Sequence, residues 1–239
     1  MRKNVEKMSI NYSPNFNIKK RISSNVKYLI FHYTGMKSEN AAIKRLTNNR
    51  SKVSCHYFIK KNGAIIKIVP DLYIAWHAGI SSWKKDKSLN SSSIGIEISN
   101  PGHSFKYQNF NREQINSIIN LSKNLKRKYK IKKENILGHS DVAPLRKKDP
   151  GEKFPWKLLS KKKICLWHNL SEKKCKKYRG IKLKDNNNFF QLLFRFGYKS
   201  TKDKHDRIKI CKNFQRRFRP QLISGIADQE TYAILKTLI

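Results

Sequence analysis

Four short runs of branched and aromatic residues constrain the fold of this 239-residue chain more than any other feature. The runs span residues 26–33, 56–60, 64–69 and 93–99. Each has the length and composition of a β-strand, and Asn62-Gly63 between the second and third is typical of a hairpin turn. Two longer segments, 39–49 and 112–129, carry apolar residues at helical spacing. The pattern predicts an α/β fold with a mixed central sheet flanked by helices.

The sequence changes character after Trp156. The stretch 161–184 is rich in lysine and holds a single acid, Glu172, which is typical of a linker. Three short amphipathic segments follow, and Gly197 and Gly225 stand where helices are expected to end. We therefore predict one domain at 12–168, a basic linker at 169–186, and a small three-helix domain at 187–239.

Residues 138–151 read GHSDVAPLRKKDPG and concentrate potential metal ligands in a short segment. His139 and Asp149 lie in this segment, and His32 stands near the end of the first apolar run. Zinc accepts imidazole nitrogen and carboxylate oxygen, and three protein ligands with the fourth position left to water are typical of a catalytic zinc. The sequence therefore predicts one Zn²⁺ held by His32, His139 and Asp149.

Glu97 and Lys147 are the candidate catalytic side chains. Glu97 is the one acid within an isoleucine-rich run, and a carboxylate beside a zinc-bound water acts as a general base. The simpler alternative is an edge strand with Glu97 facing solvent. Lys147 stands two residues before Asp149, where an ammonium group would stabilise an oxyanion, whereas most lysines of so basic a chain are solvated surface charges.

Several ordered motifs together resemble one family, the zinc-dependent N-acetylmuramoyl-L-alanine amidases of the type 2 amidase family, which are related to peptidoglycan recognition domains. The resemblance covers roughly residues 12 to 168. Besides the GHSDVAP and RKKDPG pieces, it rests on IFHYTGM at 30–36, VSCHYFIKKNG at 53–63, AWHAG at 75–79 and IGIEISNPG at 94–102.

The resemblance implies a hydrolase that cuts the amide between N-acetylmuramic acid and the L-alanine of the stem peptide. His32, His139 and Asp149 match the family's zinc ligands, Glu97 its catalytic glutamate, and Lys147 the lysine that supports the transition state. Recognition proteins of the same fold bind without cleaving when a ligand is lost, and here all three are present. Asp149 in place of a cysteine makes the chain similar to bacterial recycling and remodelling amidases.

Three further residues are predicted to bind substrate. Trp76 and His77 match the family's substrate-side loop, where an aromatic face stacks on sugar or peptide and an imidazole donates to a carbonyl. Arg146 offers a fork for a stem-peptide carboxylate. The alternatives are a tryptophan that only caps the core and an arginine that is solvated.

The segment after the linker resembles a small peptidoglycan-binding domain, with FQRRF at 214–218 and GIADQET at 225–231 as the matching pieces. Such a domain would add avidity by tethering the enzyme to its polymer. The alternative is that Phe214, Phe218, Tyr232 and Leu235 only pack the helices together.

The high positive charge of the chain raises the question of a nucleic-acid partner. Lys and Arg total 53 against 16 acids, a net charge of +37, and such a field attracts polyanions. The basic residues are scattered and no nucleic-acid motif is present, so we predict no specific nucleic-acid partner. The alternatives to an amidase are a noncatalytic peptidoglycan-binding module and, less favoured, a basic nucleic-acid-binding protein.

The partners that we predict are peptidoglycan or muropeptides, and we expect a monomer. Four cysteines without a CxxC pair do not indicate a disulfide scaffold, and the alternative is one bridge, such as Cys165 with Cys175, in an exported protein. No window is apolar enough for a membrane span, and residues 1–12 lack the apolar core of a secretory signal. That favours the cytoplasm, with the periplasm or cell envelope as the alternative.

Overall fold

The computed structural model describes residues 8–239, so part of the segment tested above for a secretory signal lies outside the described residues. The strands are β1 (Met8–Ile10), β2 (Phe16–Asn17), β3 (Tyr28–Tyr33), β4 (Tyr57–Ile59), β5 (Ile65–Lys67), β6 (Ile74–Ala75), β7 (Ser82–Trp83), β8 (Asp86–Lys87), β9 (Ser93–Ile98) and β10 (Ile136–Gly138). The α-helices are α1 (Glu39–Thr47), α2 (Arg112–Lys128), α3 (His139–Val142), α4 (Trp156–Lys161), α5 (Glu172–Tyr178), α6 (Asn187–Phe196), α7 (Lys204–Phe218) and α8 (Gln229–Lys236).

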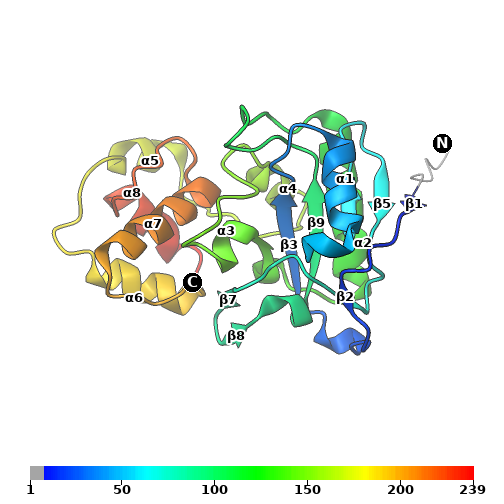
Figure 1. Ribbon diagram of the computed structural model, residues 1–239. Coiled ribbons are helices and arrows are strands. Elements are labelled where there is room, and N and C mark those ends of the chain that lie inside the picture. Colours follow the sequence, from blue (N-terminus) through cyan, green and yellow to red (C-terminus); the bar gives the residue numbers. More distant parts are fainter. Residues whose placement is uncertain (1–7) are drawn as a thin grey trace.

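A six-stranded sheet forms the centre of the molecule, in the order β1-β5-β4-β9-β3-β10. β4 and β5 pair antiparallel through the predicted hairpin, whereas β3 pairs parallel with both β9 and β10. The sheet is therefore mixed and flanked by helices, as predicted (Figure 1). In the register of β3 and β9, His32 lies opposite Glu97, so these two side chains share one face at the carboxyl ends of their strands.

One face of the sheet is covered by α2 and α4. Alternate residues of β3 and β9 point to this face, and they form one apolar cluster with the buried residues of the two helices. The cluster includes Leu29, Phe31, Ile94, Ile96, Ile98, Ile118, Leu121, Leu125 and Leu159. An Asn111–Gln114 capping box fixes the start of α2.

The opposite face is covered by two separate groups of helices. α1 packs over the β4–β5 half, where Ala42 and Leu46 meet Phe58. The helices of the C-terminal region pack over the β3 half, where they meet Tyr28 and Ile30. Figure 1 shows these helices beside the sheet, with α3 between them and β3. His32 and Glu97 point to this same face, because they continue the alternation of their strands.

The basic linker predicted over residues 169–186 is helical over part of its length. α5 begins at Glu172 after a Ser171 N-cap, buries Cys175, and is followed by Arg179, which makes a bidentate ion pair with Glu230 of α8 at 2.8 Å on both contacts. A lysine-rich linker and a helix with lysines on its exposed side have similar amino-acid compositions, so the charge of this segment did not predict α5. Within the described residues, 187–239 hold the three predicted helices, α6, α7 and α8, and α5 is an additional helix in the segment predicted as a linker.

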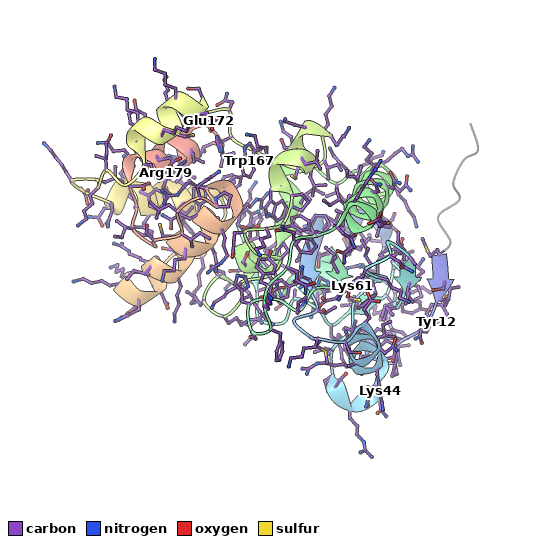
Figure 2. The ribbon with its side chains drawn as sticks, turned by 90° about the horizontal axis from the view of Figure 1, so that it is seen from above. Tyr12, Lys44, Lys61, Trp167, Glu172 and Arg179 are labelled. Carbon is purple, nitrogen blue, oxygen red and sulfur yellow. The ribbon has the colours of Figure 1, made fainter. Side chains whose placement is uncertain are left out.

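These helices are not held by a flexible tether, since their core is continuous with that of the sheet. One apolar cluster unites Tyr28 and Ile30 of β3 with Phe189, Phe214 and Phe218 of the helices. Trp83 is buried in the same cluster with its ring against Phe196 and Tyr198. Figure 2 shows the two regions side by side, with Glu172 and Arg179 on one and Lys44 and Tyr12 on the other.

Two further expectations concern the chain as a whole. The four cysteines are buried and free, so Cys165 and Cys175 are not bridged. In the described part of the chain, every helix is too short or too polar to cross a membrane.

Candidate active site

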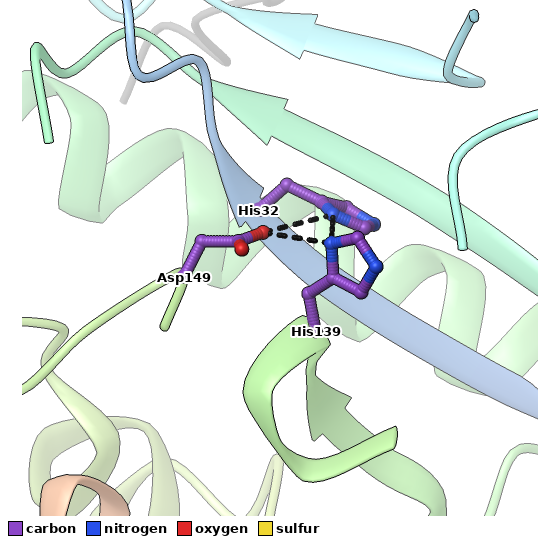
Figure 3. A group of neighbouring side chains, drawn as sticks. All are labelled: His32, His139 and Asp149. Carbon is purple, nitrogen blue, oxygen red and sulfur yellow. Dashed lines mark hydrogen bonds and ion pairs between the residues drawn. The ribbon is translucent and has the colours of Figure 1, made fainter. Parts of the chain in front are cut away.

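His32, His139 and Asp149 come together in one buried cluster, as predicted (Figure 3). His32 stands near the end of β3, His139 is the first residue of α3, and Asp149 lies in the loop that follows α3. The two Nδ1 atoms are 2.9 Å apart, and Asp149 Oδ2 lies 3.1 Å from His32 Nδ1 and 3.0 Å from His139 Nδ1. A backbone bond from Ser140 N to Asp149 O, 2.8 Å long, joins the two segments.

The surroundings of His139 decide which of its ring nitrogens carries the proton. Nε2 lies 3.1 Å from the carbonyl oxygen of Ala78, closer than the 3.4 Å that separates it from Arg146 Nη2. A carbonyl only accepts hydrogen bonds, so Nε2 carries the hydrogen and the lone pair resides on Nδ1. That lone pair faces His32 and Asp149.

A chain of hydrogen bonds determines which ring nitrogen of His32 carries the proton. Ser93 Oγ donates to the Leu89 carbonyl at 2.5 Å, so it accepts from His77 Nε2 at 3.1 Å. His77 Nδ1 is then an acceptor, and His32 Nε2 donates to it at 3.0 Å. The lone pair of His32 therefore also resides on Nδ1. Partners of this kind behind a metal-binding histidine fix its ring and its tautomer.

Three acceptor atoms thus converge on one point with no hydrogen among them. Two imidazole lone pairs and a carboxylate oxygen repel one another unless a cation lies between them. All three residues are at least nine-tenths buried, and unpaired buried polar groups cost free energy. The donor set fits a zinc ion, because two nitrogens and one carboxylate are among its usual ligand combinations.

Glu97 lies beside this cluster, on the neighbouring strand. Burial, followed by the charge of Asp149, raises the pKa of its carboxyl group to about 8, and the charge of Lys147 opposes the rise. Its Oε2 atom is buried without a hydrogen-bond partner among the described residues. A carboxyl oxygen without a hydrogen-bond partner is free to accept a proton from a reacting group. Glu97 lines the cavity described next, which excludes the alternative of a solvent-facing edge strand.

The cluster opens into a cavity of about 480 Å³. Its walls come from α1, from the strand ends and from the loop that follows α3. The basic side chains that line it are Arg45, Arg146, Lys147 and Lys148, and the acidic ones are Glu97 and Asp149. Because the two acids lie at the ligand cluster, the rest of the wall carries positive charge and suits an anionic ligand.

The residues predicted to bind substrate lie in different settings. Trp76 lines the cavity, with its indole Nε1 donating to Asn17 Oδ1 at 2.6 Å. His77 is buried, and both of its ring nitrogens are engaged by His32 and Ser93, so its geometry is that of a support for His32. Arg146 donates from Nε and one terminal nitrogen to the Ile80 carbonyl at 3.1 and 2.9 Å, and also contacts Ala78 O.

Two groups of contacts near the site were not predicted from the sequence. His103 lines the cavity, bonded through Nδ1 to the Tyr33 hydroxyl at 2.8 Å and through Nε2 to Glu152 at 3.0 Å. The second group comes from α7, where Asn213 and Arg217 reach the segment that carries His139 and Lys147. The signal for the second group was weak, because a polar residue on an amphipathic helix reads as solvent-facing.

A mixed sheet that ends at a His-His-Asp cluster, beside a half-buried glutamate and an open cavity, defines an α/β enzyme. The chain belongs to the N-acetylmuramoyl-L-alanine amidase family Amidase_2, whose model matches residues 22–152. It is accordingly an amide hydrolase. The matched segment ends just beyond Asp149 and leaves the C-terminal helices outside.

Relatives extend the similarity over nearly the whole chain. AmiD of Escherichia coli, an N-acetylmuramoyl-L-alanine amidase, is 36% identical over 232 residues, which cover 90% of this chain and 82% of AmiD. The solved complex of AmiD with anhydro-N-acetylmuramic acid-L-Ala-D-γ-Glu-L-Lys superimposes with a TM-score of 0.79 at 35% identity, over 90% and 88% of the two chains. AmpDh3 of Pseudomonas aeruginosa, in complex with an anhydromuramic pentapeptide, gives 0.80 at 31% identity over 92% of each chain.

Proposed function

We propose that this amidase uses one zinc ion, held by His32, His139 and Asp149, to cleave the bond between N-acetylmuramic acid and L-alanine in peptidoglycan or muropeptides. The convergence of three acceptor atoms on one point, beside the unpartnered Oε2 of Glu97, is the observation that carries the proposal. When bound, the zinc supplies a Lewis acid and a water of lowered pKa.

Glu97 is the group that holds and moves the proton. In the metal-free site, burial and the charge of Asp149 raise its pKa, and a raised pKa makes a carboxylate a better proton acceptor. We propose that Oε2 accepts a proton from the attacking water and then donates this proton to the leaving nitrogen of L-alanine.

Lys147 is the group that stabilises developing charge. It lines the cavity, and its positive charge opposes the rise in the Glu97 pKa that burial and Asp149 cause, so its ammonium group lies near enough to act on the reacting centre. An ammonium there favours the transition state of amide hydrolysis, in which the carbonyl oxygen becomes negative.

The substrate class follows from the cavity and from the relatives. Stem peptides carry carboxylates, which the basic wall suits, and Trp76 offers an aromatic face for sugar or peptide. Arg45 and Lys148 are better placed than Arg146 for a carboxylate, because two of the donor groups of Arg146 already bind the Ile80 carbonyl. The anhydromuramyl peptides bound by AmiD and AmpDh3 support small muropeptides as substrates.

The C-terminal helices are proposed as a peptidoglycan-binding region on the basis of their motifs. Phe214 and Phe218 are buried, so they pack the helices and are not the surface that would contact glycan. The domain boundaries at 12–168 and 187–239, the monomeric state, and the absence of a specific nucleic-acid partner stay predictions.

The test is mass spectrometry of a purified anhydromuropeptide and of intact sacculi after incubation with the protein. We expect free stem peptide, lost after treatment with a chelator and restored by one equivalent of zinc. Metal analysis of the untreated protein should give one zinc per chain. Release of stem peptide that withstands complete metal removal would contradict the zinc mechanism, and bound zinc without any cleavage would favour a noncatalytic binding module.

A further inference from the structure

One face of α7 is turned toward the loops of the active site. Asn213, Arg216 and Arg217 are spaced so that they share this face. Asn213 reaches the loop after α3, Arg216 reaches Glu152, and Arg217 reaches Asp141 of α3. A helix outside the segment that matches the amidase family thus contacts the residues on both sides of Lys147.

Asn213 makes the most direct of these contacts. Its Nδ2 group donates to the carbonyl oxygen of Pro144 at 2.7 Å and to that of Lys147 at 3.0 Å. The side chain is 3% exposed, so these bonds form away from water. The amide N–H of Lys147 donates to Ala143 O at 3.0 Å. The peptide groups on both sides of the Lys147 Cα atom are therefore held, one by the loop itself and the other by α7.

The orientation of the Asn213 amide is settled by its neighbours. Both carbonyls can only accept, so the atom between them must be the NH₂ group. The other end, Oδ1, accepts from Arg216 at 2.6 Å. An aspartate in this position would keep its contact with Arg216, lose both donors, and bring a negative oxygen toward two carbonyls.

The remaining contacts of this face support α3 and not the loop. Arg217 donates to Asp141 Oδ2 at 2.5 Å and to Ile136 O at 2.9 Å. Asp141 Oδ2 also accepts from the backbone of Gly138 at 2.7 Å, next to His139. Arg217 therefore bears on the start of α3, where His139 stands, whereas Asn213 bears on Lys147.

We infer that Asn213 is a positioning residue for Lys147, which makes α7 a working part of the active site in addition to any binding role of the C-terminal helices. The inference rests on the proposed function, because it acts through the role assigned to Lys147. The ammonium group sits at the end of a flexible stem, so its reach into the cavity depends on a fixed backbone. Misplacement of such a group by about 1 Å lowers a rate by up to about a hundredfold.

Asn213→Asp is the variant that tests the inference. We expect kcat on an anhydromuropeptide to fall between about tenfold and a hundredfold, with KM and zinc content unchanged within about twofold. Rates are normalised to folded, zinc-loaded protein, so that a loss of stability does not imitate a loss of rate. Asn135→Asp is the matched control, because Asn135 also donates from Nδ2 to a backbone carbonyl, that of Lys27 at 3.1 Å, before the starts of β10 and β3, and it should leave kcat unchanged.

A double-mutant cycle with Lys147→Ala separates positioning from a general structural effect. If Asn213 acts through Lys147, Asn213→Asp should change kcat by less than about twofold in the Lys147→Ala background. An equal loss in both backgrounds would overturn the inference, as would an unchanged kcat in the single variant. Asn213→Ala, which removes the donors without adding charge, should reproduce the loss.

The outcomes also distinguish this inference from the proposed function. Absence of cleavage by the parent protein, or an unchanged kcat for Lys147→Ala, would refute the proposed function or the role of Lys147 within it. A loss with Lys147→Ala but none with Asn213→Asp would refute the positioning role alone. If neither variant at 213 folds, Asn213 is a structural residue and the inference is wrong.

Discussion

The sheet and the C-terminal helices differ in the kinds of side chain that they bury. The β3–β9 centre of the sheet is apolar on one face and keeps its ionisable groups at the strand ends, where His32 and Glu97 stand. The helical region buries charge within its core. Arg219 pairs there with Asp228 at 2.7 Å and with Glu230 at 3.2 Å, and Arg217 pairs with Asp141 across the boundary between the regions.

The two regions therefore contribute to the candidate active site in different ways. The sheet supplies the proposed ligand His32 and the proposed base Glu97 on strands whose positions are set by apolar packing. The helices supply ion pairs and hydrogen bonds that hold the loops around those groups. Loss of a group in the sheet should therefore remove chemistry with little loss of stability, whereas loss of one in the helices should reduce stability first.

The largest effect is expected for Glu97→Gln, which keeps the shape of the side chain and removes the base. The rate of cleavage should fall by about 10² to 10⁴, the usual contribution of a general base. Steady-state kinetics on a muropeptide measures this. A variant that retained more than about a tenth of the parent rate would show that Glu97 is not the base.

The same variant should be more stable than the parent when both are free of metal and the pH is high. The folded-state pKa of Glu97, about 8, lies above its ordinary value. The folded protein therefore loses stability as the pH rises from about 4.5 through 8 and the buried carboxyl group ionises. Glutamine does not ionise, so thermal unfolding with a chelator should show an advantage of Glu97→Gln at pH 8.5 that disappears near pH 4.5.

The next largest effect is expected for Arg217→Met, at the boundary between the two regions. This change leaves Asp141 buried without its partner, which typically costs about 3–5 kcal/mol. Thermal unfolding should show a lower melting temperature, and the rate per folded molecule should change far less than in Glu97→Gln. Arg195→Met, at an exposed position of α6, is the matched control and should change stability by less than about 0.5 kcal/mol.

A smaller effect is expected for Gly95→Ala, which tests the support behind His32. A Cβ atom on Gly95 would overlap the ring of His77. The ring must move, so His32 loses the partner that fixes its tautomer, and zinc affinity should fall by about 10- to 100-fold. Competition with a zinc chelator measures the affinity. An unchanged zinc affinity, in a folded variant, would show that the Ser93–His77–His32 chain has no role in metal binding.

Much of the sheet and its site could be predicted because local sequence carried the signal. Branched residues marked the strands, and His32 and Glu97 stood out as polar residues within apolar runs. The role of His77 was not readable in the same way, because a histidine that contacts substrate and one that supports a ligand have the same sequence context. Only its contacts with His32 and Ser93 separate the two.

The helical region was less predictable, because its important contacts join distant segments. The Asn213–Lys147 bond spans 66 residues and the Arg217–Asp141 pair spans 76. No local pattern on α7 marks these partners, since asparagine and arginine on an amphipathic helix are typical of a solvated face. α5 was missed for a related reason, because its lysines concealed the single buried Cys175.

The position of α7 in the chain has a consequence for biosynthesis. A nascent chain that has been made through Asp149 already contains every proposed ligand and both proposed catalytic groups. It lacks Asn213 and Arg217, and with them the contacts that hold the loop and α3. The order of translation would thus delay full activity until α7 has emerged and docked against the loop that carries Lys147.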